Sequence, residues 1–560
     1  MKRDLPALTS KKYELVVVGG GIFGVCAAWD AALRGLSTVI LERGDFCQAT
    51  SANHFKVVHG GIRYIQHLDF YRVRESSRER NILLRIAPHL VQPLPIVIPT
   101  YGHGLTGKEI LRAGFALYDI MTLDRNSGIG DPERQIPSAR FLSRKKVLSL
   151  FPGLEEKGLT GGAVFCDGQM YNPTRLAISF LRSAVNAGAE AANYVSVEDL
   201  LFKENRLCGV KARDILSDSK FEVRGKMVLN TAGPWAHRIL NKSLGLELNP
   251  KPVFSRDLAF VVNRPPISRY GLAFSTKTKD VDSVLDRGGR HLFALPWRGV
   301  TLIGVWHKVF ERVPEEISVS ETELQTFVNE VNESCPYLNL RTQDISMVNT
   351  GLTLFGDEDH QGSSQMSFGK RSRLIDHGSE HDLEGLITLI GVRATTAQGM
   401  AEKAIDLVLK RLGKHGGKSR TSVSPIYGGS ISHFEKYVES ASKANSSIDA
   451  GIMRCLVHNY GSQYQRVLNY IDEDPSLAEP LNGSSVIKAE VVHAVREEMA
   501  QKLSDVVFRR TDVGTAAMPG EDALTSCANL MAVEKGWKQG QIEAELAEVR
   551  KAYPPFNKKY

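Results

Sequence analysis

The strongest constraint on the fold lies near the N-terminus, between residues 13 and 42. A short β-branched run, Leu15 to Val18, stops at three glycines, as a buried parallel strand does. An alanine-rich helical pattern follows from Ile22 to Leu33, and a second apolar run ends at Glu42. Strand, helix and strand follow one another within about thirty residues, which is the length that a parallel crossover requires. The chain is therefore predicted to begin with a Rossmann-type unit.

The glycine-rich turn after the first strand has a pattern that binds dinucleotides. Gly19 permits the tight turn, Gly21 lets a pyrophosphate approach the backbone, and Gly24 lets the helix pack on the strand. The helix N-terminus offers amide groups and a positive dipole end to the phosphates. Glu42, at the end of the second strand, is placed to accept hydrogen bonds from a ribose hydroxyl.

Two later turns favour FAD over a nicotinamide cofactor. Residues 230–235 end a strand in small residues, which allows a second close approach of backbone to cofactor. Residues 391–396 enter a helix through glycine and hydroxyl-bearing residues, which suits amides that face an isoalloxazine or an anionic substrate. Each turn alone is more typical of an ordinary capped connection than of a cofactor contact. The further predicted cofactor contacts are Thr50, Ser51, Val195, Ala232, Gly233, Trp235, Gly391, Thr395 and Thr396.

Length and composition limit the class of protein. A chain of 560 residues is expected to form two or three domains. The net charge of +7 is spread along the chain, so it suits an anionic ligand or membrane surface and does not indicate nucleic acid. Seven cysteines without CxxC spacing predict neither zinc nor disulfides, and hence no metal and a cytoplasmic protein. The absence of a secretory signal and of any 18-residue apolar run agrees with this.

The segment from Lys56 to Tyr64, Lys-Val-Val-His-Gly-Gly-Ile-Arg-Tyr, carries a family resemblance. Together with the glycine turn, it makes the chain similar to the FAD-dependent, aerobic, quinone-linked glycerol-3-phosphate dehydrogenases over nearly its whole length. The other motifs that carry the resemblance are Thr50 to Ala52, Ala87 to Leu90, Asn230 to Trp235, Leu295 to Trp297, Thr395-Thr396 with Met400 to Ala404, Tyr460 to Ser462 and Arg509 to Thr511.

The resemblance implies an α/β fold with three domains. A Rossmann-type FAD-binding domain is assembled from the separated segments 1–80, 155–240 and 345–415. An α+β substrate-binding domain with an antiparallel sheet takes residues 81–154 and 241–344. A C-terminal all-α domain takes residues 425–560. Long charged amphipathic segments beyond Pro425, among them residues 485–508, independently predict helices there. Residues 108–121 also have a helical pattern.

The resemblance also implies a reaction. A secondary alcohol of a small polyol phosphate loses a hydride to flavin N5 and a proton to a base, and the electrons pass to membrane quinone. His59, Arg63 and Arg393 are the predicted catalytic residues. A histidine can take the proton, and lysine or arginine can hold a phosphate or carboxylate. The predicted substrate-binding residues are Lys56, Tyr64, Thr353, Lys370 and Arg371.

Three substrate-side motifs depart from the family pattern. Gly304-Val305-Trp306-His307 stands where the family has Gly-Thr-Thr-Asp, and Gly351-Leu352-Thr353-Leu354 stands where it has Gly-Val-Arg-Pro. Gly391-Val392-Arg393-Ala394 replaces Gly-Gly-Lys-Leu. The loss of an arginine removes a bidentate phosphate contact of about 1.5–3 kcal/mol, part of which Arg393, Lys370 or Arg371 can restore. A substrate other than glycerol 3-phosphate is therefore a hypothesis to test.

Several alternatives stay open on the sequence alone. One is an oxidase or dehydrogenase of the same fold that acts on another hydroxylated or amino substrate. Others are a flavoprotein that modifies tRNA and a relative that holds FAD without catalysis. Residues 108–118 are compatible with peripheral contact on the cytoplasmic membrane as well as with core packing. A homodimer is also compatible with the resemblance.

Overall fold

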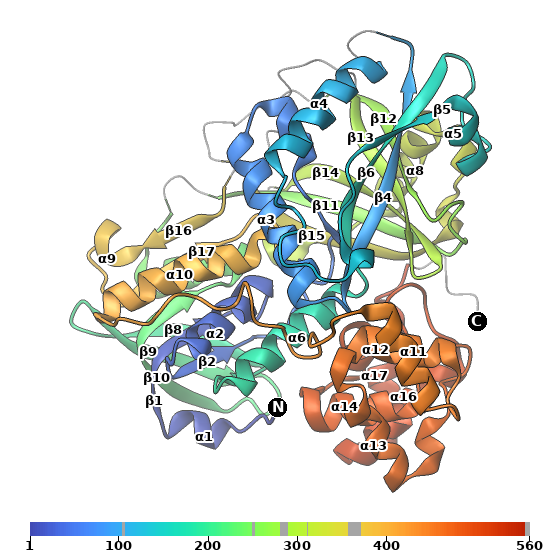
Figure 1. Cartoon of the computed structure of the whole chain (residues 1–560). Helices are drawn as coiled ribbons and strands as arrows, with labels where there is room; N and C mark the ends of the chain where they lie inside the picture. The colour runs from blue at the N-terminus through green and yellow to red at the C-terminus, as the bar shows by residue number, and fades with distance from the viewer. Residues whose placement is uncertain (104–106, 249–251, 280–288, 311, 357–370, 555–560) are drawn as a thin grey trace.

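Two β-sheets and a group of C-terminal helices make up the protein (Figure 1). The computed structural model describes all residues except 104–106, 249–251, 280–288, 311, 357–370 and 555–560. Figure 1 shows the helices of the C-terminal part gathered at one end of the molecule, below the second sheet and beside the first. This arrangement agrees with the predicted fold class.

The first sheet contains the predicted Rossmann-type unit. Its strands run in the order β16-β17-β10-β1-β2-β7, and β1, β2, β7, β10 and β17 are parallel neighbours. Three helices pack on one face through the largest apolar core. The strands are β1 (Lys12–Val18), β2 (Thr38–Leu41), β7 (Glu190–Ala192), β8 (Val195–Lys203), β9 (Arg206–Asp214), β10 (Lys220–Asn230), β16 (Arg373–Asp376) and β17 (Leu386–Ile390), and the helices are α2 (Ile22–Leu33), α6 (Pro173–Asn186) and α10 (Ala397–Leu412).

The second sheet is almost entirely antiparallel, and its order is β15-β11-β14-β13-β12-β4-β6-β3. Helix α8 (Glu321–Ser334) packs on one face, where Phe327 contacts Phe260 and Trp306. The opposite face is turned toward the loop that follows β2. The strands are β3 (Val57–Val58), β4 (Val91–Tyr101), β5 (Arg140–Ser143), β6 (Leu159–Met170), β11 (Val253–Val262), β12 (Gly271–Lys279), β13 (Gly289–Trp297), β14 (Val300–Phe310) and β15 (Ile345–Gly356).

Strand pairing crosses the domain boundaries expected from the sequence. β6 and β15 fall in ranges assigned to the FAD-binding domain, yet both pair with strands of the second sheet. The chain passes between the two sheets several times, so their cores are built from segments far apart in sequence. The division into three domains stays a prediction.

The segments that connect the two sheets are mainly helical. Helix α4 has the bounds expected from the sequence pattern. Its neighbour α3 is the longest helix described and leads directly into β4. These elements are α1 (Leu5–Thr9), η1 (Ile62–His67), α3 (Phe70–Ile86), α4 (Lys108–Met121), α5 (Arg144–Leu150), α7 (Ala236–Leu244), α9 (His377–Glu380) and η8 (Ala394–Thr396).

The C-terminal part is helical, as the amphipathic segments predict. The expected helix over residues 485–508 is divided, because Met499 adopts a left-handed conformation with φ 56° after α14. The helices are α11 (Phe434–Ala444), α12 (Ala450–Tyr460), α13 (Gln465–Glu473), α14 (Lys488–Glu498), α15 (Leu503–Asp505), the π-helix η11 (Val506–Arg510), α16 (Glu521–Lys535) and α17 (Gln539–Lys551).

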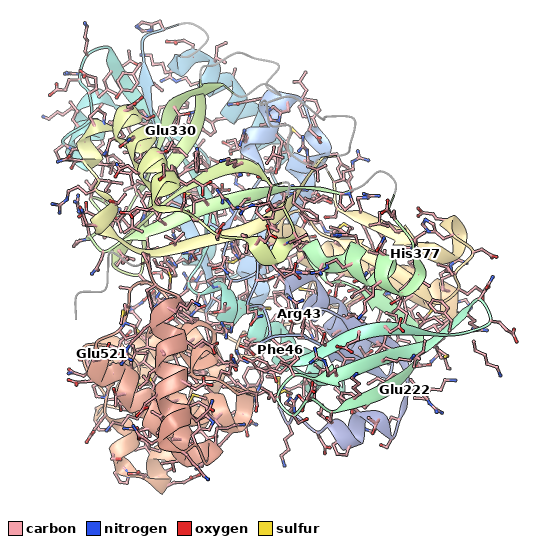
Figure 2. All side chains as sticks on the ribbon, turned by 180° about the vertical axis from the view of Figure 1, so that it is seen from behind. Arg43, Phe46, Glu222, Glu330, His377 and Glu521 are labelled. Atoms are coloured by element: carbon pink, nitrogen blue, oxygen red, sulfur yellow. The ribbon has the colours of Figure 1, made fainter. Side chains whose placement is uncertain are left out.

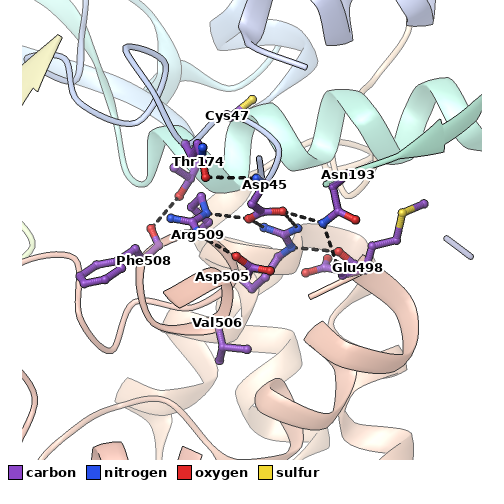
Figure 3. Close-up of polar contacts among 12 residues, drawn as sticks. Asp45, Cys47, Thr174, Asn193, Glu498, Asp505, Val506, Phe508 and Arg509 are labelled. Atoms are coloured by element: carbon purple, nitrogen blue, oxygen red, sulfur yellow. Dashed lines mark hydrogen bonds and ion pairs between the residues drawn. The ribbon is translucent and has the colours of Figure 1, made fainter. Parts of the chain in front are cut away.

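A buried ion cluster joins these helices to the first sheet (Figure 3). Both oxygens of Asp45, in the loop after β2, accept hydrogen bonds from Arg510 at 2.7 Å. Arg509 Nε donates to the same carboxylate at 2.6 Å, and Asn193 Nδ2 donates at 3.0 Å. Burial alone would raise the pKa of Asp45, but Arg510 and Arg509 hold it at about 2. Asp45 and Arg510 are fully buried, so the contact is held away from water.

Asp45→Asn is expected to destabilise the protein by about 3–5 kcal/mol, because the buried Arg510 guanidinium loses its carboxylate partner and Arg509 keeps only Asp505. The native contribution exists above the ordinary aspartate pKa of about 4 and is lost as the pH falls toward 2. Denaturant unfolding of the wild type and the variant at several pH values measures both effects. Asp218→Asn, which breaks an exposed ion pair with Arg213, is the control and should cost less than about 1 kcal/mol. Equal losses in the two variants would contradict the prediction.

Candidate cofactor and substrate site

A cavity of about 780 Å³ opens where the glycine turn, the loop after β2 and the second sheet meet. Its volume lies within the usual range for cofactor sites. Figure 2 shows Arg43 and Phe46, from the loop after β2, near the middle of the molecule between the sheets and the C-terminal helices. The predicted cofactor residues that line the cavity are Gly19, Gly21, Glu42, Thr50, Ser51, Val195, Ala232, Gly233, Trp235 and Gly391.

The glycine turn is built for close approach. Gly19 has φ 103°, and a Cβ atom added to it would lie 2.7 Å from the carbonyl oxygen of Thr231. Gly24 does not line the cavity, and its added Cβ would lie 2.0 Å from the Gly19 oxygen. Gly24 therefore serves the packing of α2 on the turn, whereas Gly19 and Gly21 present backbone to the cavity.

Two polar side chains support this turn from the loop after β2. Glu42 accepts hydrogen bonds from the amides of Gly20 at 2.7 Å and Gly44 at 2.8 Å, and burial raises its pKa. The Ser51 hydroxyl accepts a hydrogen bond from the Ile22 amide at 2.9 Å, at the N-terminus of α2. In dinucleotide sites, a carboxylate at the end of the second strand binds the ribose, and glycine backbone at a helix N-terminus binds the pyrophosphate. Glu42, the glycine turn and the start of α2 have this arrangement. The residues present therefore fit FAD.

The turn before α10 is more crowded than the sequence suggests. The Phe23 ring lies against Gly391, where an added Cβ would approach it to 2.0 Å. Thr395 and Thr396 are buried and do not line the cavity, although their neighbours Val392 and Ala394 do. The Glu79 carboxylate accepts a hydrogen bond from the Gly399 amide at 3.1 Å. One amide in the first turn of α10 is thus already used by a protein carboxylate.

Lys56 is buried beside the cavity. Its ammonium group donates to Asn349 Oδ1 at 2.6 Å and lies 4.7 Å from the centre of the Trp297 ring. Burial lowers the pKa of Lys56 to about 7. The Lys56 amide donates to His54 Nδ1 at 3.0 Å, and His54 lines the cavity. A buried lysine held by a neutral amide retains its capacity to bind an anion or exchange a proton.

His59, Tyr64 and Arg393 come together in a second group. The rings of His59 and Tyr64 meet edge to face at 5.8 Å, and the Arg393 guanidinium carbon lies 5.4 Å from the Tyr64 ring centre. Arg393 also pairs with Glu75 at 2.6 Å and donates to Ser76 at 2.9 Å. The structure thereby joins three of the predicted residues around η1.

Several arginines lie near His59 and influence its pKa. Burial lowers its pKa to about 3, and the nearby arginines act in the same direction. These arginines come from η1, α3 and the turn before η8, and they are Arg63, Arg72, Arg80 and Arg393. His59 is therefore neutral at physiological pH and can accept a proton.

The remaining predicted residues lie at different places. Arg63 is exposed on η1, and Arg371 lies 5.3 Å from the ring centre of Tyr71 at the start of α3. Thr353 lines the cavity and donates to Asp257 at 2.9 Å. Lys370 lies outside the described residues. Within the described part of the chain, no cluster of three or more His, Cys, Asp or Glu side chains suits a metal ion.

Sequence reasoning missed several polar residues of the site. Asn349 and Asp257 reach it from β15 and β11. His54 and Asn349 each precede a motif of the sequence analysis by two residues, Lys56–Tyr64 and Gly351–Leu354, and this position was the available signal. No nearby motif marks Asp257, and only the pairing of β11 with β15 reveals it.

Comparison with known proteins defines the class. Residues 14–392 match the family model described as FAD dependent oxidoreductase, and residues 419–542 match the C-terminal domain of alpha-glycerophosphate oxidase. The protein is an FAD-dependent oxidoreductase. A glycerol-3-phosphate dehydrogenase of Synechocystis sp. is 32% identical and covers 97% of each chain, and an aerobic glycerol-3-phosphate dehydrogenase of Bacillus subtilis is 29% identical over 91% of this chain and 88% of its own. The chain belongs to the FAD-dependent glycerol-3-phosphate dehydrogenase family.

A solved structure shows the same fold. The glycerol-3-phosphate dehydrogenase from Bacillus halodurans, in complex with FAD, superimposes with a TM-score of 0.77 at 24% identity, covering 98% of this chain and 96% of its own. The family membership confirms the predicted flavoenzyme and its FAD cofactor. The roles of individual residues stay predictions.

Gly19→Ala is expected to abolish FAD retention, because the new methyl group would meet the backbone of Thr231 and Ala232. Gly35→Ala is the matched control. It has φ 79°, so alanine carries a similar conformational strain of about 1–2 kcal/mol, but no atom lies within 4 Å of the added Cβ. The ratio of flavin to protein absorbance after purification measures the effect. A yellow Gly19→Ala protein with full occupancy would contradict the assigned role of the turn.

Proposed function

We propose that the protein oxidises a secondary alcohol of a small polyol phosphate, either glycerol 3-phosphate or a related compound, and passes the electrons to quinone. The observation that carries this proposal is the group of arginines near His59, two of which lie over the Tyr64 ring. The relatives from Synechocystis sp. and Bacillus subtilis are named for glycerol 3-phosphate, which supports the substrate class. FAD, when bound, supplies the hydride acceptor for the alcohol carbon.

The arginines supply the affinity for an anion. Arg393 and Arg72 both lie over the Tyr64 ring, with guanidinium carbons 5.4 and 4.3 Å from its centre. Each is also paired with a carboxylate, Glu75 for Arg393 and Asp69 for Arg72, and these pairs hold the side chains in place. Such pre-positioning lowers the entropy lost when a phosphate or carboxylate binds.

His59 is the proposed base. Oxidation of the alcohol to a ketone removes a hydride from the carbon and a proton from the hydroxyl, and His59 takes the proton. Its low pKa in the free protein results from burial and from surrounding cations. A bound phosphate adds negative charge beside the imidazole and raises its pKa toward neutrality. The base therefore gains strength when the anionic substrate is present.

An exposed apolar surface on α3 and α4 supports contact with a membrane. We define the apolar patch as Leu68, Phe70, Tyr71, Leu117, Ile120 and Leu123, whose exposed fractions range from 39% for Leu117 to 81% for Leu123. Arg74 of α3 donates to the carbonyl of Met121 and pairs with Asp124, so the two helices adjoin (Figure 1). Apolar side chains exposed together in this way are typical of interaction sites.

The patch differs from the sequence expectation for residues 108–118. Phe115 and Tyr118 pack inward, and Leu117 is the one patch residue inside this segment, whereas the others lie farther along the chain or around the start of α3. Arg371 and Lys403 flank Tyr71, which adds the positive charge that an anionic lipid surface attracts. No helix in the described ranges is long and apolar enough to cross a membrane. We therefore infer a peripheral contact that gives access to quinone.

His59→Asn is expected to slow flavin bleaching by glycerol 3-phosphate about 10²–10⁴-fold, because proton removal loses its base. Anaerobic stopped-flow absorbance measures the rate, and the flavin spectrum before mixing checks that the cofactor is bound. The exposed His415→Asn serves as the control and should leave the rate unchanged. If the wild type is bleached by neither glycerol 3-phosphate nor any other polyol phosphate, the proposed activity is wrong.

Ile120→Glu combined with Leu123→Glu is expected to abolish flotation of the holoenzyme with vesicles of anionic phospholipid, because two charges would enter the apolar contact. Reduction of a lipid-soluble quinone in these vesicles should fall with flotation, while reduction of a water-soluble dye stays unchanged. Val533→Glu, on α16 of the C-terminal part, replaces an equally exposed apolar residue and is the control. A patch variant that floats like the wild type would overturn this inference.

A further inference from the structure

Three strands of the second sheet place a carboxylate, an imidazole and two hydroxyls together. His307 Nδ1 of β14 lies 2.7 Å from Asp257 Oδ1 of β11. The hydroxyl of Ser255 donates to the same oxygen at 2.9 Å, and that of Thr353 on β15 donates to Oδ2 at 2.9 Å. We refer to Ser255, Asp257, His307 and Thr353 as the Asp257 cluster.

The alternation of side chains along β11 turns this cluster toward the cavity. Leu258 and Phe260 belong to the core that packs against α8. Asp257 and Ala259 point to the opposite face, because successive side chains of a strand alternate. On that face Gly351, the partner of Asp257 in β15, lies against Thr50, and both Thr50 and Thr353 line the cavity.

The cluster lies on a different wall from the arginines. Thr353 belongs to the second sheet, whereas Val392 and Ala394, on either side of Arg393, line the same cavity from the turn before α10. Asp257 keeps 23% of its side chain exposed and His307 keeps 16%, so neither group is sealed in the core. The turn that carries Arg393 and the strand that carries Thr353, the partner of Asp257, therefore both border the cavity.

The donors and acceptors of the cluster select the group that fits it. A phosphate or carboxylate offers only acceptors and would meet the negative charge of Asp257. The hydroxyls of Ser255 and Thr353 already donate to Asp257, so a ligand meets the remaining lone pairs of the carboxylate, which accept a donor. A hydroxyl group can donate to the carboxylate, and a polyol phosphate carries no ammonium group that would compete for this position. Thr353, at the position of the family's arginine, also removes the cation that would hold a phosphate on this wall.

We propose that Asp257, held by His307 and Thr353, binds a substrate hydroxyl adjacent to the alcohol that is oxidised. The anionic end of the substrate then lies on the opposite wall, near Arg393 and Tyr64. The inference rests on the proposed function and narrows its substrate class to polyol phosphates with a free hydroxyl next to the reacting carbon. Asp257 is thus a residue that determines specificity.

The test compares glycerol 3-phosphate with its deoxy analogue, propane-1,2-diol 1-phosphate, which keeps the secondary alcohol and the phosphate but replaces the terminal hydroxyl by hydrogen. The holoenzyme should prefer glycerol 3-phosphate by about tenfold or more in kcat/KM, because a hydrogen bond to a charged group gives a preference of this size. Asp257→Asn should remove most of this preference by lowering kcat/KM for glycerol 3-phosphate alone. Thr353→Val should reduce the preference severalfold while keeping the side-chain volume.

Asp472→Asn, at an exposed position on α13, is the matched control and should leave the preference intact. Equal use of both compounds by the wild type would overturn the proposal. An equal fall in kcat/KM for both compounds in the Asp257→Asn protein would also overturn it, because that result indicates a structural role. A rise in kcat/KM for both compounds would overturn it as well, because that result indicates that Asp257 merely repels the anionic substrate. The same preference can be measured without turnover in the His59→Asn protein, whose flavin is bleached slowly. Each compound is titrated into this protein, and its dissociation constant is obtained from the change in flavin absorbance that accompanies binding. Failure of the proposed activity is therefore distinguishable from failure of this inference.

Discussion

The buried carboxylate of Asp45 holds the cofactor side of the molecule together. It accepts hydrogen bonds from Arg509 and Arg510 of the C-terminal helices and from Asn193 between β7 and β8. An isolated charge at such a depth costs several kcal/mol, so the carboxylate and its partners must stay in contact. Because Asp45 follows Glu42 by three residues, the same contact fixes the carboxylate that supports the glycine turn. The C-terminal helices thus contribute to cofactor binding without lining the cavity.

The loop after β2 transmits this constraint to the rest of the site. The Phe46 ring is buried and lies against Gly20, where an added Cβ would come within 2.5 Å of it. Farther along, the Thr50 hydroxyl donates to the Leu352 carbonyl at 3.1 Å and accepts from the Leu352 amide at 3.0 Å. These contacts place one loop in touch with the first sheet, the second sheet and the C-terminal helices. Its position therefore determines how the substrate wall faces the cofactor wall.

The sequence predicts the cofactor half of this arrangement well, because local rules govern it. The turn from Gly19 to Gly24 needs only a strand, a helix and glycines at fixed spacing, all within a short segment. The same holds for α4, whose apolar periodicity gives its bounds. The proposed substrate half is harder to predict, because Asp257 meets Thr353 only through the pairing of β11 with β15, and Lys56 meets Asn349 only through a loop that crosses the sheet. No local pattern contains that information.

The proposed binding mode separates the residues that bind the substrate from those that bind the cofactor. Glu42 and the glycine turn belong to the first sheet, and their geometry depends on backbone contacts that few substitutions preserve. Asp257 and Thr353 project from the second sheet as side chains. A substitution there alters charge and hydrogen bonding but leaves strand pairing intact, since the ladder is made by the backbone. Substrate preference can therefore diverge through a few side chains on β11, β14 and β15, whereas the cofactor site requires the whole loop and its buried ion cluster to remain in place.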